Sequence, residues 1–116
     1  MIEEIREHFK KEYPREGCGV IGIVNNEKEW FPCKNIAKVE QNFVMCPEDW
    51  FKLRTTVEIH AIVHSHPDDS NEASQHDIDC CNIMGIPYYI FSYPEMELNI
   101  LEPKEQFTSV FSEKKV

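Results

Sequence analysis

Two histidines, a serine and an aspartate in the middle of the chain have the types and spacing of a hydrolytic metal site. His64 and His66 end the segment 57–66, whose alternating β-branched residues predict a strand, and strand periodicity puts both imidazoles on one face. Ser74 and Asp77 are three residues apart at the start of a predicted helix, where such side chains are neighbours. Two imidazoles and one carboxylate hold zinc and leave a fourth position for water, which is the arrangement that zinc hydrolases require.

Each of these residues has a simpler interpretation when it is taken alone. A single histidine in a strand is more often a structural or surface residue, and S-Q-H-D at 74–77 resembles a helix capping box with Asp in place of Glu. Capping and metal binding are compatible. The combination of H-x-H, a spacer and S-x-x-D needs four residues at four offsets, which chance produces on the order of once in a few thousand such chains. The pattern therefore favours a metal site.

The combined pattern resembles the metal motif of the JAMM (Mov34/MPN/PAD-1) metallopeptidases, with H-S-H-P at 64–67 followed by S-Q-H-D at 74–77. The N-terminal part supports this resemblance, because R-E-G-C-G-V at 15–20 resembles the E-x-C-G signature of the bacterial and phage members. The resemblance implies a JAMM/MPN-like, cytidine-deaminase-like α/β domain that binds one zinc ion per chain.

Site residues follow from the same resemblance. It implies His64, His66 and Asp77 as the metal ligands and Glu16 as the general acid/base that zinc-dependent hydrolysis needs. It implies Ser74 as the hydroxyl that stabilises the tetrahedral oxyanion. The ligand set also suits iron or cobalt, so the residues alone indicate only a divalent ion.

Further segments are similar to the N-terminal domain of phage tail-tip assembly proteins of the lambda K type; they are 32–37, Phe43, 47–50 and 85–87. Such proteins commonly continue into a Cys/His peptidase domain of the NlpC/P60 type, whereas this sequence ends at Val116. A trimmed piece, a short phage protein and a stand-alone bacterial enzyme all remain open, as does the oligomeric state.

The first functional hypothesis is hydrolysis of a peptide or isopeptide bond, in phage tail-tip assembly or in cell-wall penetration. Its partners would be a ubiquitin-like tail, a peptidoglycan peptide or other tail-tip proteins. The alternatives are a non-catalytic structural or docking module of a phage tail tip, and a bacterial peptidase for a ubiquitin-like sulfur carrier. A zinc nucleobase deaminase is excluded because the sequence lacks the H-x-E and P-C-x-x-C signature.

The elements that must position these residues alternate between helix and strand. Hydrophobic periodicity and turn residues predict helices at 2–12, 47–55 and 74–84, and strands at 18–24, 29–33, 57–66, 86–93 and 97–101. This order predicts an α/β layered fold with a mixed β-sheet flanked by helices, in a single domain over 1–116. The end, 113–116, is expected to fray.

Composition limits the partners and the compartment. Twelve basic and 21 acidic residues give a net charge of −9, which disfavours nucleic acid and anionic membranes. No segment has the roughly 18 apolar residues of a membrane span, and the N-terminus lacks the apolar region of a signal peptide. Five cysteines without a C-x-x-C pair indicate reduced thiols. A cytoplasmic location is expected, in the host if the protein is phage-encoded, with incorporation into the virion tail also open.

The other histidines are not expected to bind the metal. His60 would share the ligand face of the strand but lie about 13 Å from His64 at roughly 3.3 Å per residue. His8 and His76 are expected to face solvent. Asp68, Asp69 and Glu72 form a hydrated loop that would tune substrate charge.

Overall fold

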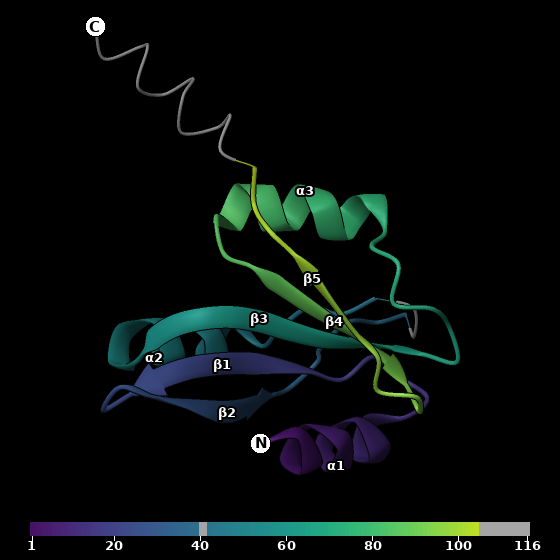
Figure 1. The fold of residues 1–116 in the computed structure, drawn as a ribbon, viewed down its shortest axis with the longest axis horizontal. Coiled ribbons are helices and arrows are strands. Elements are labelled where there is room, and N and C mark those ends of the chain that lie inside the picture. The colour runs from purple at the N-terminus through teal and green to yellow at the C-terminus, as the bar shows by residue number, and fades with distance from the viewer. Residues whose placement is uncertain (40–41, 105–116) are drawn as a thin grey trace, which may run out of the picture.

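Within residues 1–39 and 42–104, which the computed structural model describes, five strands form one sheet (Figure 1): β1 (Cys18–Val24), β2 (Glu27–Cys33), β3 (Glu58–Pro67), β4 (Tyr88–Tyr93) and β5 (Leu98–Leu101). Their spatial order is β2-β1-β3-β4-β5. The β3–β4 pair is parallel and the other neighbouring pairs are antiparallel. The sheet is therefore mixed, as the sequence predicts.

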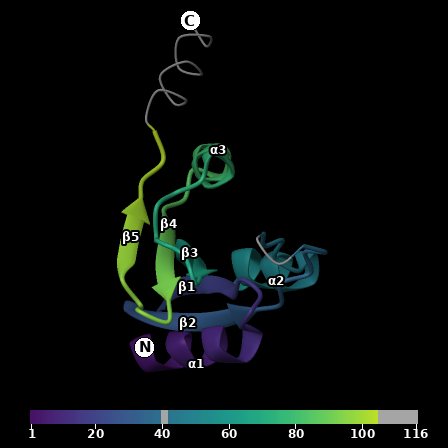
Figure 2. The ribbon, with the colours of Figure 1, turned by 90° about the vertical axis from the view of Figure 1, so that its right-hand side faces the viewer.

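Three helices flank this sheet in the described part of the chain: α1 (Ile2–Glu12), α2 (Pro47–Thr56) and α3 (Gln75–Met84). Figure 2 shows α1 on one face and both other helices on the opposite face. The predicted α/β layered class is confirmed, and element bounds differ from the expected ones by at most two residues. The frayed end expected at 113–116 lies outside the described residues.

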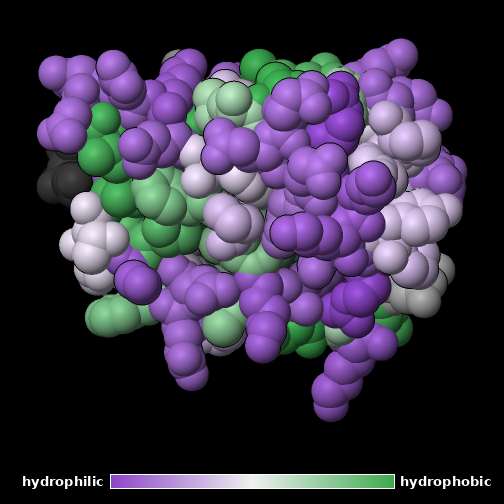
Figure 3. Space-filling view, turned by 90° about the horizontal axis from the view of Figure 1, so that it is seen from below, coloured by the Kyte–Doolittle hydropathy of each residue, from purple (hydrophilic) through white to green (hydrophobic). Residues whose placement is uncertain are grey.

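The packing of α1 follows from its amphipathic sequence. Ile5 and Phe9 are fully buried and join a core cluster with Trp30 of β2 and Ala61 and Val63 of β3. The outer surface on this side is mostly hydrophilic when the molecule is seen from below (Figure 3). Burial of the apolar stripe against the sheet holds the helix in place.

Local sequence signals explain where the elements begin and end. Asn25 and Asn26 have φ angles of 53° and 66°, which asparagine tolerates and which a tight β1–β2 hairpin requires. Pro47 starts α2, where its missing N–H is not needed. Gly85 ends α3 with a φ of 67°, a left-handed conformation that suits glycine.

A β-bulge in β3 changes the side-chain alternation near His60. Consecutive residues Ile21 and Gly22 of β1 pair with Ala61 and Ile59, so His60 is the extra residue. Its Nε2 lies 3.1 Å from the hydroxyl of Tyr89, a residue that packs against the α1-side cluster. The expectation that His60 shares the ligand face is therefore wrong, whereas its structural role is supported.

No helix in the described ranges is long and apolar enough to cross a membrane.

Candidate metal centre

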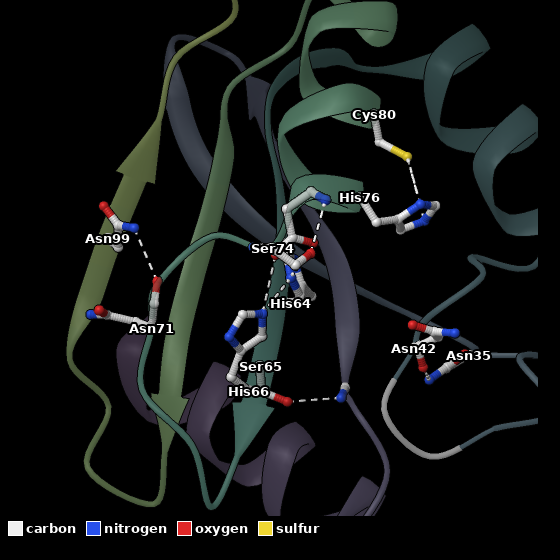
Figure 4. A network of polar contacts seen from close by, with 12 residues as sticks. Asn35, Asn42, His64, Ser65, His66, Asn71, Ser74, His76, Cys80 and Asn99 are labelled. Atoms are coloured by element: carbon white, nitrogen blue, oxygen red, sulfur yellow. Dashed lines mark hydrogen bonds and ion pairs between the residues drawn. The ribbon is translucent and has the colours of Figure 1, made fainter.

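The β3–α3–β4 crossover brings the predicted ligands together. His64 and His66 lie near the C-terminal end of β3, and Asp77 lies in the first turn of α3. Figure 4 shows the two imidazoles pointing toward the start of α3, where Ser74 lies. Parallel pairing of β3 with β4 requires the chain to return through α3, so the start of this helix meets the end of β3.

Potential ligand atoms of three side chains lie close to one another. Nε2 of His64 is 3.2 Å from Nε2 of His66 and 3.2 Å from Oδ1 of Asp77. Nε2 of His66 is 3.2 Å from Oδ2 of Asp77. Ligand atoms about 2.0–2.1 Å from a tetrahedral zinc ion are separated by roughly 3.3 Å, so this donor set fits a divalent ion of that size.

The α3 capping box fixes the carboxylate of Asp77. The N–H of Asp77 donates to Oγ of Ser74 at 3.0 Å, and the N–H of Ser74 donates to Oδ2 of Asp77 at 3.0 Å. The capping interpretation is thereby confirmed, and it is compatible with metal binding by Asp77. Burial alone would raise the pKa of Asp77, but its contacts with His64 and His66 hold the pKa well below its usual range.

Burial determines the protonation of the two histidines. His64 is fully buried, which lowers its pKa below the ordinary value despite the neighbouring carboxylate, so its imidazole is neutral. Burial also opposes protonation of His66, but contacts with Asp77 and the carbonyl of Ser70 raise its pKa. A neutral His64 is a ready metal ligand, whereas protons compete with a metal at His66.

The ring of His64 is held by packing rather than by a second hydrogen bond. Its Nδ1 is buried and has no hydrogen-bond partner among the described residues. Phe43 stacks on the imidazole with ring centroids 4.4 Å apart, and Tyr88 meets it edge-on at 5.9 Å. These two aromatic rings fix the imidazole plane and keep water from it. No role in the site was predicted for Phe43.

Glu16 reaches this centre through the pairing of β1 with β3. Cys18 pairs with His64 in the register, so the residue two positions before Cys18 lies near the end of β3. The side chain of Glu16 is only 7% exposed and lines the same cavity as His66 and Asp77. Burial raises its pKa to about 8, an effect that His66 reduces and Asp77 increases.

Three neighbours hold the backbone around Glu16. The amide of Asn35 donates to the carbonyl of Glu16 at 2.7 Å, and Oγ of Ser65 accepts from the N–H of Gly17 at 2.8 Å. A Cβ at Gly17 would lie 2.6 Å from the ring of Phe9, so only glycine fits here. The roles of Asn35 and Ser65 were missed, because each depends on a contact between distant parts of the chain.

Replacement of Ser65 by alanine should lower the free energy of unfolding by about 1–3 kcal/mol, since the buried N–H of Gly17 would lose its acceptor. Urea denaturation of the metal-free protein measures this change. Asn82→Ala is the control, because Oδ1 of Asn82, in the last turn of α3, accepts the exposed N–H of Lys104 at 2.9 Å, which water can satisfy after the substitution. If Ser65→Ala leaves stability unchanged, the hydrogen bond does not hold Glu16 in place.

A cavity of about 440 Å³ opens above the centre. Ser74, His66, Asp77 and Glu16 line it, together with the predicted acidic loop residues Asp68, Asp69 and Glu72. His76 is exposed, as expected. His8, in contrast, is half-buried and its Nε2 lies 3.1 Å from the carbonyl of Cys18, so its expected exposure to solvent is wrong.

Two histidines and an aspartate meet at the junction of β3 and α3, on a mixed sheet that is flanked by helices. This arrangement is that of a JAB/MPN-type domain. Residues 1–103 match the family described as prokaryotic homologs of the JAB domain, and the chain belongs to this family. The resemblance seen in the sequence is thereby confirmed.

A known relative agrees with this assignment. The chain is 36% identical over 104 residues to tail tip assembly protein K of Escherichia phage N15, covering 89% of this chain and 43% of that protein. The chain therefore spans less than half the length of this relative.

Solved structures support the fold. A JAB1/MPN domain protein from Archaeoglobus fulgidus superposes with a TM-score of 0.58 at 22% identity, covering 87% of this chain and 82% of the other. A solution structure from Desulfitobacterium hafniense superposes with a TM-score of 0.67 at 22% identity, covering 85% and 75%.

Proposed function

We propose that the protein is a zinc-dependent metallopeptidase that hydrolyses a peptide or isopeptide bond. The observation that carries this proposal is the meeting of the His64 and His66 Nε2 atoms, 3.2 Å apart, with the Asp77 carboxylate, which places one oxygen 3.2 Å from each of them. The cavity beside this cluster is also lined by the buried Glu16. A purely structural metal site would have no need of a buried acid beside it.

The proposed chemistry assigns one task to each group. His64, His66 and Asp77 would hold the ion, which supplies Lewis acidity toward a carbonyl and makes water acidic enough to lose a proton near neutral pH. Glu16 accepts that proton as the water oxygen attacks the carbonyl carbon, and returns it to the amine as the C–N bond breaks. The hydroxyl of Ser74 accepts from the N–H of Asp77, so its own proton is free to donate to the oxyanion.

The raised pKa of Glu16 supports its role in proton transfer. A carboxyl group with a pKa of about 8 in the metal-free protein holds a proton at neutral pH. A cation nearby would lower that pKa toward neutrality, because positive charge favours the ionised carboxylate. A group with a pKa near the working pH can both take and give a proton.

Zinc loading tests this proposal. Protein with about one zinc per chain should release amines from at least one of three substrate kinds: linear peptides, isopeptide-linked conjugates or cross-linked peptidoglycan. Treatment with a chelator should abolish the release, and added zinc should restore it. The proposal fails if the zinc-loaded protein cleaves none of these faster than the chelated protein.

A second function is supported by the relative in phage N15, whose name describes tail-tip assembly. In this alternative the domain is a structural or docking module in a phage tail, its partners are other tail proteins, and metal serves only folding. It would be made in the host cytoplasm and carried in the virion. Normal tails assembled with Glu16→Gln protein would favour this alternative over catalysis.

A further inference from the structure

A second cavity, lined almost entirely by apolar side chains, adjoins the metal centre. It has a volume of about 380 Å³ and lies between α2 and α3, on the sheet face opposite α1. Buried Ile62 and Tyr88 form its floor. Its walls come from the loop before α2 and from the two helices, and they include Phe43, Val44, Met45, Trp50, His76 and Met84.

The two cavities share a wall. Phe43 and His76 line both of them, and Phe43 also stacks on the His64 ring at 4.4 Å. One aromatic ring therefore separates the apolar cavity from the metal ligands. Because an extended peptide advances about 3.3 Å per residue, this separation corresponds to one or two residues of a bound chain.

The lining determines what can occupy this cavity. Asp, Glu, Lys and Arg are absent from its described lining, and the metal cavity next to it is acidic and polar. At the mouth, Val44 is 50% exposed and Met84 is 38% exposed, so apolar surface faces water there. Ligand pockets are hollows of this kind, apolar with a few polar groups at one end.

We propose that this cavity, hereafter the apolar pocket, receives a leucine- or phenylalanine-sized side chain of the substrate, one or two residues from the amide that is cleaved. This inference rests on the proposed peptidase function and narrows its substrate class to protein segments with a bulky apolar residue at that place. Peptidoglycan stem peptides are built from alanine, glutamate and a diamino acid, so they carry no side chain that would fill the pocket.

Methionine methyl groups provide a direct measure of occupancy. Met45 and Met84 line the apolar pocket, whereas Met1 and Met96 lie elsewhere and serve as internal controls. Zinc-loaded Glu16→Gln protein with ¹³C-labelled methionine methyls would be titrated with N-acetyl-leucyl-glycyl-glycinamide and, separately, with its seryl analogue.

The leucyl peptide should shift the resonances of Met45 and Met84 saturably and leave those of Met1 and Met96 in place, while the seryl peptide should bind at least about tenfold more weakly. Equal binding of both peptides, or of a peptidoglycan stem peptide, would overturn the proposal, as would shifts confined to Met1 and Met96. Absence of any shift would overturn it too. This measurement needs no hydrolysis, so its outcome is independent of whether the protein is a peptidase.

Paired variants at the end of α3 test the same pocket through catalysis. Met84→Glu puts a charge at its mouth, whereas Ile83→Glu puts the same charge at a 75% exposed neighbour outside the lining. The kcat/KM for a leucyl substrate should fall about 10- to 100-fold in Met84→Glu and stay within about twofold in Ile83→Glu. Equal effects of the two substitutions would contradict the assignment, and circular dichroism of both variants verifies that they fold.

Discussion

Glu16→Gln should lower the rate of amide hydrolysis by about 10²- to 10⁴-fold while the protein keeps its metal. Glutamine has nearly the same shape as glutamate but cannot accept the proton of the attacking water. The proposed ligands are His64, His66 and Asp77, so the metal content should stay at that of the wild type. Single-turnover kinetics together with elemental analysis of the same samples measure both quantities.

Glu29→Gln is the matched control for this experiment. It removes the same charge at an exposed position of β2, away from the metal cavity. Its rate should stay within about twofold of the wild type, because surface substitutions rarely have large effects. A Glu16→Gln protein that retains more than half of the wild-type rate would rule out Glu16 as the base, even if hydrolysis itself were demonstrated.

Asp77→Ala should abolish zinc binding and, with it, the stabilisation that zinc confers. At a free zinc concentration of about 1,000 times Kd, binding should raise the free energy of unfolding of the wild type by about 4 kcal/mol. The alanine variant should show no such increase. In the absence of metal, its free energy of unfolding should also be about 1 kcal/mol lower than that of the metal-free wild type, because its capping box is broken. Denaturation with and without zinc separates the two losses.

Two further substitutions separate metal binding from helix capping. Asp77→Asn retains an oxygen that can accept from the N–H of Ser74, so it should lose less metal-free stability than Asp77→Ala while zinc affinity falls. Asp79→Ala removes an exposed acid on the same helix, which contacts Gln75 rather than the ligands. If Asp79→Ala lost zinc as fully as Asp77→Ala, the assignment of the ligand would be wrong.

Local patterns were sufficient to predict most elements of this fold. The start of α3 at Ser74 and its end at Gly85 depend on capping groups within a few residues of each helix end, so sequence alone reveals them. The shared face of His64 and His66 depends only on the period of a strand. Both signals lie within one segment, and they were enough to predict the ligand cluster.

The features that the sequence did not reveal all depend on contacts between segments. A bulge opposite Ile21 and Gly22 turns His60 away from the ligand face, and bulges arise from pairing with another strand rather than from the strand's own sequence. Asn35 and Ser65 hold the backbone at Glu16 and Gly17 through hydrogen bonds to a distant part of the chain.

The sequence by itself determined the types and spacing of the proposed ligands, the helix that carries Asp77 and the resemblance to JAMM peptidases. Only the tertiary structure decided that Glu16 shares a cavity with these ligands, through the β1–β3 register that pairs Cys18 with His64. It also decided that Phe43 stands between the metal centre and the apolar pocket. The physical reason is that a side chain's local conformation depends on its neighbours in sequence, whereas its burial and partners depend on strand pairing and packing across the whole fold.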